Sequence, residues 1–278
     1  MTVLEVLQST TAYFKKHEIE SPRLNAEHLL AHALQRKRIE LYLEFERPLA
    51  EAELAPLREL VRRRGQGEPL QHLLGTVEFA GRVFLCDRRA LVPRPETEEL
   101  VEKLTAMKWP EGARFADVGT GSGVIALTLA AQFPAAEVQA VDISEEALSL
   151  ARENAARLEL QDRVTLVRSN LLAEVEGAFD LIVANLPYVP LGDRPTLSRE
   201  VLQDPEVAVF GGERGDELVR ELIEAAPARL RPGGMLALEI GIEQAEKLAA
   251  LLDEKNYHDI ASIRDYCGVI RFLFGRYG

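Results

Sequence analysis

The sequence is short of cysteine, of long hydrophobic runs and of positive charge, and each shortage excludes a class of protein. Its only cysteines, Cys86 and Cys267, have neither the number nor the spacing of a disulfide framework or a Cys-x-x-Cys motif. No apolar run approaches the ~18 residues of a membrane-spanning helix, and the first residues lack the pattern of a signal peptide. We therefore expect a cytoplasmic protein with reduced thiols and no membrane contact.

Positive charge is scarce over most of the chain. The 33 basic and 45 acidic residues give a net charge of −12. Residues 1–75 hold equal numbers of each sign, so the rest of the chain carries the whole deficit. Proteins that bind nucleic acid usually present a basic surface, so no direct nucleic-acid substrate is expected, although a local basic groove would override this mean field.

The first 65 residues are expected to be helical. Pro22 is typical of the first turn of a helix, apolar residues recur at helical spacing across 24–33, and residues 50–64 form a further helical pattern. His28 and His32 share a helix face, but no third ligand accompanies them, so we predict no metal site.

Two basic clusters, at 36–38 and 62–64, leave two interpretations open. They contact an acidic partner or RNA, or they are solvated helix ends. No catalytic constellation appears in this helical region, which is more typical of a recognition module.

A glycine-rich turn from Asp117 to Gly123 follows a strand-like segment, 113–118, and opens an apolar helical pattern, 124–130. Glycines let a ligand approach the backbone closely, and the N–H groups at the start of a helix favour a negative group such as a carboxylate. This order of strand, turn and helix indicates a nucleoside cofactor. Considered alone, the turn is also compatible with an ordinary helix start.

The following strand-like segment, 137–142, ends in Asp142, at the separation from Gly123 expected for a carboxylate that binds ribose hydroxyls. A dinucleotide fingerprint requires Gly-x-Gly-x-x-Gly, and here Val124 stands at the last position. The pattern therefore argues against a nicotinamide cofactor.

The tetrapeptide Asn185-Leu186-Pro187-Tyr188 ends the apolar run 179–184 and is suited to hold a planar NH2 group. The Asn185 side-chain oxygen and the carbonyl of Leu186 can accept its two N–H bonds, and the Tyr188 ring offers a stacking face. Pro187 biases the preceding residue toward an extended conformation. A strand-terminating turn is the alternative interpretation.

Strand and helix patterns alternate over the rest of the chain, which predicts a doubly wound α/β sheet. Further strands are expected at 164–167, 178–184, 235–240, 260–264 and 269–274. No helix separates the last two, so we expect a hairpin there. The long loop 189–215 is interpreted as a lid or substrate clamp, with disorder as the alternative.

Taken together, these motifs resemble the HemK/PrmC family, the protein-(glutamine-N(5)) methyltransferases that modify peptide chain release factors. The most discriminating string is Pro93-Arg94-Pro95-Glu96-Thr97-Glu98, in which Thr97 is a candidate N-cap. Further matches include Glu239, Gly241, Gln244, Asp265 and Arg271. The family usually has Asn-Pro-Pro-Tyr where this chain has Leu186.

The resemblance implies a fold and a set of site residues. The fold is a class I S-adenosylmethionine-dependent methyltransferase, a Rossmann-like mostly parallel sheet with an antiparallel edge strand, preceded by a small helical domain. S-adenosylmethionine would be bound by Asp117, Gly119, Thr120, Gly121, Ser122, Gly123, Asp142, Asn170, Leu171 and Asn185. Catalysis and substrate binding would fall to Asn185, Leu186, Pro187 and Tyr188, with Arg94 and Glu96 as further substrate contacts.

The resemblance also implies the domains and the reaction. We expect a helical substrate-recognition domain at 1–75, a β-hairpin linker at 76–95 and a catalytic domain at 96–278. The expected reaction methylates the glutamine side-chain amide in the Gly-Gly-Gln motif of class 1 release factors. Adenine-N(6) methylation of ribosomal RNA or DNA is the alternative, since it also presents a flat NH2 group. A non-catalytic S-adenosylmethionine-binding module is a third hypothesis.

Overall fold

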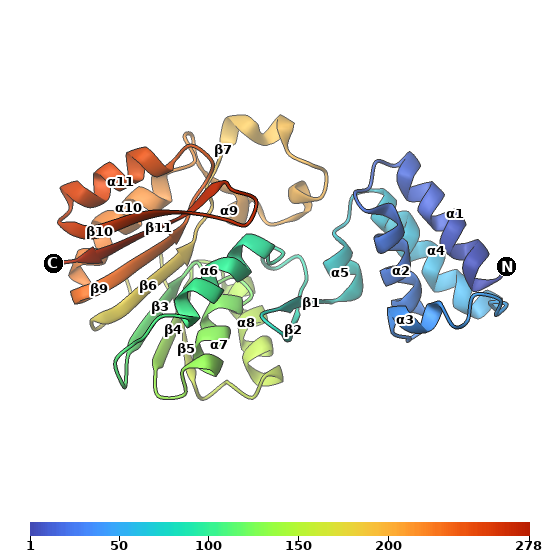
Figure 1. Ribbon diagram of the computed structural model, residues 1–278, viewed down its shortest axis with the longest axis horizontal. Coiled ribbons are helices and arrows are strands. Elements are labelled where there is room, and N and C mark those ends of the chain that lie inside the picture. Colours follow the sequence, from blue (N-terminus) through green and yellow to red (C-terminus); the bar gives the residue numbers. More distant parts are fainter. The chain divides into compact units, whose positions relative to one another are not determined.

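The computed structural model describes all residues of the chain, 1–278, and they group into two compact units. The first unit comprises Met1–Thr76 and Ser198–Gln203. The second comprises Val77–Leu197 and Asp204–Gly278. Figure 1 shows the helices of the first unit and the mixed α/β arrangement of the second.

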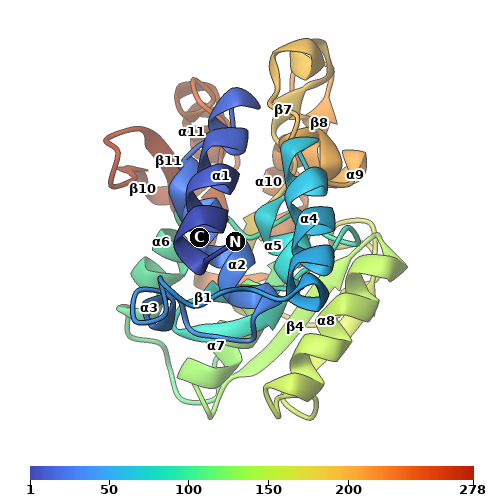
Figure 2. The same cartoon turned by 90° about the vertical axis from the view of Figure 1, so that its right-hand side faces the viewer.

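The first unit is helical. Its elements are α1 (Val3–Lys16), α2 (Pro22–Ala33), α3 (Arg38–Leu41), α4 (Glu51–Gly65), α5 (Leu70–Leu74) and the short 3₁₀ helix η2 (Val201–Gln203). In Figures 1 and 2, α1, α2 and α4 lie side by side. α1 begins at a capping box in which Thr2 and Glu5 exchange side-chain and backbone hydrogen bonds. Phe14, Leu29 and Leu57 are buried in the core between these helices.

The positive charges of the basic cluster at the end of α4 are paired with glutamates of the first unit. Arg62 and Arg63 form ion pairs with nearby glutamates. Arg64 is buried, and its guanidinium donates to Asn25 Oδ1 at 2.7 Å and to Glu200 Oε2 at 2.7 Å. The interpretation as a solvated helix end suits Arg62, but for Arg64 both sequence interpretations were wrong.

A two-stranded sheet follows the helical segment. β1 (Thr76–Phe79) and β2 (Arg82–Leu85) are joined by Ala80 and Gly81, which both have positive φ. Positive φ at both central residues is typical of the two-residue turns that match strand twist.

The second unit is built on a seven-stranded sheet in the order β10-β11-β9-β6-β3-β4-β5. The strands are β3 (Arg114–Val118), β4 (Glu137–Asp142), β5 (Val164–Arg168), β6 (Phe179–Asn185), β9 (Leu230–Glu239), β10 (Tyr257–Arg264) and β11 (Ile270–Tyr277). The helices are α6 (Pro95–Thr105), α7 (Val124–Gln132), α8 (Glu145–Arg157), α10 (Glu217–Ala225), the 3₁₀ helix η3 (Ala226–Ala228) and α11 (Ala245–Glu254).

Helices cover both faces of this sheet. Successive side chains of β6 alternate between two cores: Leu181 and Val183 belong to one, and Ile182 and Ala184 to the other. The first core includes side chains of α6, α7 and α8, and the second includes those of α10 and α11. The result is the three-layered, doubly wound arrangement visible in Figure 1, as the sequence predicts.

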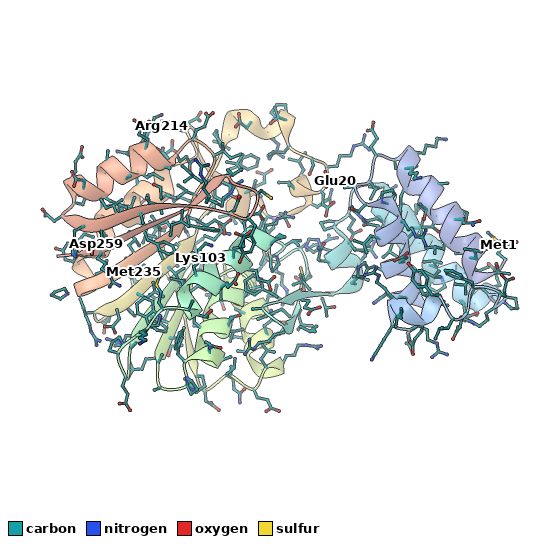
Figure 3. The ribbon with its side chains drawn as sticks, viewed as in Figure 1. Met1, Glu20, Lys103, Arg214, Met235 and Asp259 are labelled. Atoms are coloured by element: carbon teal, nitrogen blue, oxygen red, sulfur yellow. The ribbon has the colours of Figure 1, made fainter.

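α6 packs on the face of the sheet that holds the first core. Lys103, labelled on this helix in Figure 3, lies with its Nζ 5.3 Å from the ring centroid of Phe272 on β11. α6 thus lies over the side of the sheet where β9 and β11 follow β6.

The last two strands form the predicted hairpin. β11 pairs antiparallel with both β9 and β10, whereas β3, β4, β5, β6 and β9 are mutually parallel where they pair. The edge strand β10 is therefore antiparallel to its neighbour, and the final strand of the chain is inserted next to β9. The expected class I fold, a mostly parallel sheet, is confirmed. The antiparallel strand was expected at the edge, but it is β11, which lies one position in from the edge, between β9 and β10.

The long loop after β6 contains short elements: β7 (Val189–Pro190), η1 (Leu191–Thr196), α9 (Glu206–Val209) and β8 (Phe210–Gly212), in addition to η2. β7 and β8 pair in parallel. A Cβ at Gly211 would lie 2.3 Å from the carbonyl oxygen of Pro187, so only glycine fits there. Separately, no helix of the chain combines the length and apolar composition needed to cross a membrane.

Candidate active site

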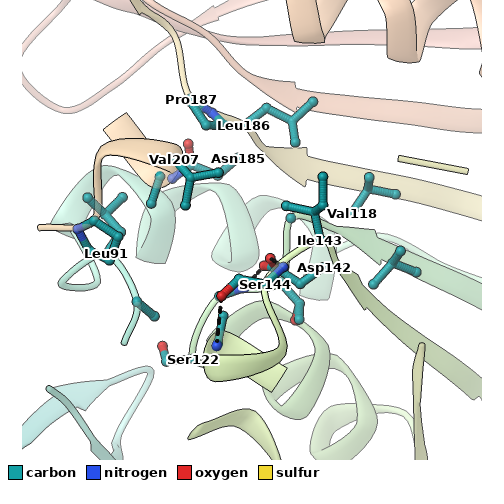
Figure 4. Close-up of a pocket in the computed structure, with 18 of the residues that line it drawn as sticks. Leu91, Val118, Ser122, Asp142, Ile143, Ser144, Asn185, Leu186, Pro187 and Val207 are labelled. Atoms are coloured by element: carbon teal, nitrogen blue, oxygen red, sulfur yellow. Dashed lines mark hydrogen bonds between the residues drawn. The ribbon is translucent and has the colours of Figure 1, made fainter. Parts of the chain in front are cut away.

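A cavity of about 210 Å³ lies at the carboxyl ends of β3, β4 and β6. This edge is where open α/β sheets bind ligands. Figure 4 shows Asp142 and Ser144 near Ser122 on one part of its wall, and Asn185, Leu186 and Pro187 on another. The two motifs singled out in the sequence therefore border one cavity.

The glycine turn brings the backbone close to the tetrapeptide. Gly119 has φ +76°, and a Cβ there would lie 2.9 Å from Leu186 Cδ2. Gly121 has φ +55° and its N–H donates to Asp142 Oδ2 at 2.8 Å. The turn needs glycine both for its left-handed backbone and for the close approach of the segment after β6.

Two residues of the turn do not line the cavity. Gly123 instead supports helix packing, since a Cβ there would lie 3.1 Å from Leu127 Cδ1 and 3.2 Å from Ala151 Cβ. Asp117 is fully buried, and its Oδ2 accepts from Thr120 Oγ1 at 2.6 Å and from Ala126 N at 3.0 Å. Burial, with a smaller contribution from the nearby Asp142 charge, raises the pKa of Asp117 to about 7 against the opposing bonds from Thr120 and Ala126. A direct cofactor contact by either residue stays a prediction.

Asp142 is held rigidly at the cavity wall. Its Oδ1 accepts from Ser144 N at 2.9 Å, while its Oδ2 accepts from Gly121 N. Burial raises its pKa, and these backbone hydrogen bonds oppose the rise by stabilising the charged form. Each carboxylate oxygen has a second lone-pair direction, so the group can still accept hydrogen bonds from a bound ligand.

The wall next to Asp142 suits a nucleoside. Asn170 and Leu171, expected as cofactor contacts, follow β5 and line the cavity together with Ile143, Val207 and Ala208; their contact with a cofactor stays a prediction. The last two belong to α9, which the sequence did not assign to the cofactor site. Apolar side chains beside a carboxylate fit the flat base and the ribose hydroxyls of one ligand.

Three of the four residues of the tetrapeptide line the cavity. Asn185, Leu186 and Pro187 line the cavity, but Tyr188 does not. The Arg271 guanidinium lies 5.9 Å from the Tyr188 ring centroid. Burial raises the pKa of Tyr188 to about 12, with a further contribution from the charge of Glu239. Stacking of Tyr188 on a substrate therefore stays a prediction.

Arg94 and Glu96, the other expected substrate contacts, also differ in position. Arg94 lines the cavity and its Nη2 lies 2.7 Å from Asp204 Oδ2. Asp204 has a fully buried side chain that also accepts from Val92 N at 3.2 Å. Glu96 does not line the cavity. Asp204 was missed in the sequence because it lies far along the chain, in a loop with no local motif.

Thr97 is not an N-cap. α6 begins at Pro95 with Arg94 as its N-cap, which places Thr97 in the first turn. Its hydroxyl accepts from Asn185 Nδ2 at 2.9 Å and donates to Glu239 Oε2 at 2.8 Å. Thr97 and Glu239 are functional candidates to which the sequence assigned no such role.

No group of three or more His, Cys, Asp or Glu side chains is arranged to hold a metal ion. The two cysteines are free thiols: Cys86 is buried and Cys267 is exposed. Burial raises the pKa of the Cys86 thiol to about 12. The thiol is therefore protonated near neutral pH and a poor nucleophile.

Comparison with known proteins agrees with this geometry. Residues 95–255 match the family described as methyltransferase small domain, and residues 5–75 match the PrmC N-terminal domain. A 16S rRNA N2 G1207 methyltransferase of T. thermophilus, solved with AdoMet and guanosine, has the same fold, with a TM-score of 0.53. The two proteins are 22% identical, and the match covers 73% of this chain and 50% of that chain. The second unit is thus that of a class I S-adenosylmethionine-dependent methyltransferase.

Curated relatives narrow the class to one family. A release factor glutamine methyltransferase of Geobacter sulfurreducens is 40% identical, with 100% of this chain and 97% of the relative covered. A protein of the same name from Deinococcus radiodurans is 42% identical, with 99% of each chain covered. The chain belongs to the release factor glutamine methyltransferase family.

Proposed function

We propose that this protein transfers a methyl group from S-adenosylmethionine to the side-chain amide nitrogen of the glutamine in the Gly-Gly-Gln motif of class 1 release factors. The observation that carries the proposal is the position of Asn185. It borders the same cavity as the glycine turn and Asp142, in a chain similar over its full length to release factor glutamine methyltransferases. A release factor substrate belongs to translation, so the proposal includes a cytoplasmic location.

The residues around the cavity fit S-adenosylmethionine, which supplies an electrophilic methyl group when bound. Asp142 would accept hydrogen bonds from the ribose hydroxyls, because its carboxylate is fixed at the wall by two backbone N–H groups. The close backbone approach at Gly119 and Gly121 would accommodate the amino acid portion of the cofactor. Asn170 and Leu171 would border the base.

An amide nitrogen is a weak nucleophile because its lone pair is delocalised. The Asn185 side-chain oxygen and the Leu186 carbonyl would accept its two N–H bonds, which favours a pyramidal nitrogen as positive charge develops. Much of the acceleration would come from positioning the nitrogen in line with the methyl group. The methylated nitrogen is acidic while cationic, so no strong base is needed to remove its proton.

We assign the helical residues 1–75 to release factor recognition. The support is the match of residues 5–75 to the PrmC N-terminal domain. Arg94 and Glu96 are proposed as contacts to the substrate near the cavity, and the loop 189–215 as a clamp that closes on the substrate.

Adenine methylation of RNA or DNA is the second candidate, since Asn185 would hold any planar NH2 group. The charge of −12 weighs against it. The discriminating experiment supplies methyl-labelled S-adenosylmethionine with purified release factor in one tube and unmethylated ribosomal RNA in another. Label on the release factor, lost when the Gly-Gly-Gln glutamine is replaced by alanine, supports the proposal. Label only on RNA overturns it, and cofactor binding without transfer to either indicates a non-catalytic module.

A further inference from the structure

Asn185 faces a buried carboxylate on the neighbouring strand. β6 and β9 pair in parallel with Asn185 opposite Glu239. Both side chains follow the alternation that directs Leu181, Val183 and Ala237 into the core beneath α6. α6 places Thr97 over the same face. Sheet register therefore brings two strand ends and one helix turn together, and of these residues Thr97 and Asn185 line the cavity.

These residues form a continuous chain of hydrogen bonds. Asn185 Nδ2 donates to Thr97 Oγ1 at 2.9 Å, and Thr97 Oγ1 donates to Glu239 Oε2 at 2.8 Å. Thr97 is 3% exposed and Glu239 1% exposed. The second carboxylate oxygen, Glu239 Oε1, is buried without a hydrogen-bond partner. Protein groups rather than solvent therefore set the direction of each bond.

The direction follows from counting protons. A threonine hydroxyl has a single proton to donate, and an ionised carboxylate can only accept. Thr97 must therefore donate to ionised Glu239, and can only accept from Asn185. In the opposite orientation of the Asn185 amide, its oxygen would face the Thr97 hydroxyl, whose only proton is already donated to Glu239. The chain thus turns Nδ2 toward Thr97 and leaves Oδ1 for a ligand.

We propose that Glu239, acting through Thr97, is a positioning residue that orients the Asn185 amide so that its oxygen accepts the substrate N–H group. The inference rests on the proposed function for the identity of the substrate. It assigns Glu239 no contact with substrate or cofactor, because Glu239 does not line the cavity.

The arrangement depends on the ionisation of Glu239. Burial raises the pKa of Glu239 to about 7; the bond from Thr97 opposes this, Glu96 of α6 adds to it, and Arg271 of β11 and Asn185 of β6 lower it. Tyr188, after β6, also faces this charge. Protonated Glu239 can itself donate to Thr97, which frees the hydroxyl proton and removes the constraint on Asn185. Turnover should therefore fall as the pH drops below about 7.

The test is Glu239→Gln, measured with release factor and S-adenosylmethionine at a series of pH values. Glutamine can donate as well as accept, so it no longer dictates the direction of the chain. We expect kcat to fall about 10- to 100-fold, as for other losses of positioning, with little change in KM. In the pH profile of kcat, the decrease near pH 7 that comes from protonation of Glu239 should disappear in the variant. Any decrease that comes from protonation of Asp117 should remain. Cofactor affinity by calorimetry should be unchanged.

A second pair of variants guards against misfolding. Thr97→Val keeps the shape of the side chain and removes the hydroxyl, whereas Thr97→Ser keeps the hydroxyl. We expect valine to lower kcat as Glu239→Gln does, and serine to restore most of it. Wild-type kcat and an unchanged pH profile in both Glu239→Gln and Thr97→Val would overturn the inference.

Failure of the proposed function is a separate outcome. It shows in the wild-type protein, which would then leave the release factor unlabelled. If the wild type labels RNA instead, the same variants are measured with RNA, because the orientation of Asn185 matters for any planar NH2 group. If the wild type labels the release factor and the variants match it, only the positioning role is wrong.

Discussion

At the scale of single residues, three carboxylates lie at or near the site and differ in their hydrogen-bond donors. Asp117 and Glu239 are buried, whereas Asp142 is partly exposed at the cavity wall. Asp117 accepts from the Thr120 hydroxyl and from a backbone N–H of α7, Asp142 accepts from two backbone N–H groups at the cavity wall, and Glu239 accepts from the Thr97 hydroxyl. Burial raises the pKa of all three. Their partners indicate three roles: holding the turn, binding the ligand and orienting Asn185.

Asp142→Ala should weaken binding of S-adenosylmethionine. Hydrogen bonds to a charged group contribute about 1.5–3 kcal/mol each, so losing even one such bond predicts a roughly 10- to 100-fold higher Kd. Isothermal titration calorimetry measures this directly. Asp253→Ala, at an exposed position on α11, is the matched control and should bind like the wild type. Equal affinity in the two variants would refute the ribose assignment.

Glu27 makes part of the stability of the first unit depend on pH. Burial alone would raise the pKa of Glu27, but hydrogen bonds from Tyr42, Arg38 and Arg23 outweigh it and lower the pKa from 4.5 to about 2. A lowered pKa stabilises the fold above the unfolded value, and the stabilisation is lost as the pH falls from about 4.5 toward 2.

The measurement is urea unfolding at several pH values between about 6 and 3, comparing wild type with Glu27→Gln. The unfolding free energy of the wild type should decline more steeply below about pH 4.5, with a total difference on the order of 2–3 kcal/mol. If the unfolding free energies of the two proteins changed with pH in parallel, the pKa of Glu27 would not be lowered as described.

At the scale of elements, the end of α4 carries a buried charge that depends on a distant segment. Arg64 bonds Asn25 of α2 and Glu200, next to η2, within the first unit. Arg64→Ala would leave the buried Asn25 and the partly exposed Glu200 without this donor and should cost about 3 kcal/mol of stability. Arg62→Ala removes an exposed ion pair with Glu59 and an exposed hydrogen bond to Gln66, and should cost less than about 1 kcal/mol. Thermal unfolding compares them, and similar losses would contradict the distinction.

Local elements could be predicted from the sequence where a pattern lies within one segment. The strand ending at Asp142 spans Glu137–Asp142 as expected, and Pro22 begins α2. The first turn of α6 was misjudged because Pro95 already occupies its first position, which leaves Arg94 as the N-cap and moves Thr97 inside the helix.

Glu239 shows what the sequence could not reveal. Its place at the end of an apolar strand was visible, but its partner depends on which strand lies next to β6. The intervening loop and α10 separate β6 from β9 in sequence, and β11 returns from the chain end to the other side of β9. Strand order comes from packing the whole sheet, so the pairing of Glu239 with Asn185 follows only from the tertiary structure.

At the scale of the whole molecule, the sequence predicted the class of fold more completely than the residues of the candidate site. The alternation of strand and helix indicated a doubly wound sheet, which the structure has. The grouping of Ser198–Gln203 with the first unit had no sequence signal, because it rests on bonds such as that between Arg64 and Glu200. The negative charge lies outside residues 1–75, which is consistent with a protein rather than a nucleic-acid substrate.

The central claim concerns one atom, the side-chain nitrogen of the substrate glutamine. The most direct test is tandem mass spectrometry of a release factor after incubation with S-adenosylmethionine and either wild type or Asn185→Ala. The account predicts one added methyl on the amide nitrogen of the Gly-Gly-Gln glutamine with the wild type, formed about 100-fold more slowly with the variant at saturating acceptor. A methyl on any other residue, or an equal rate with Asn185→Ala, would contradict it.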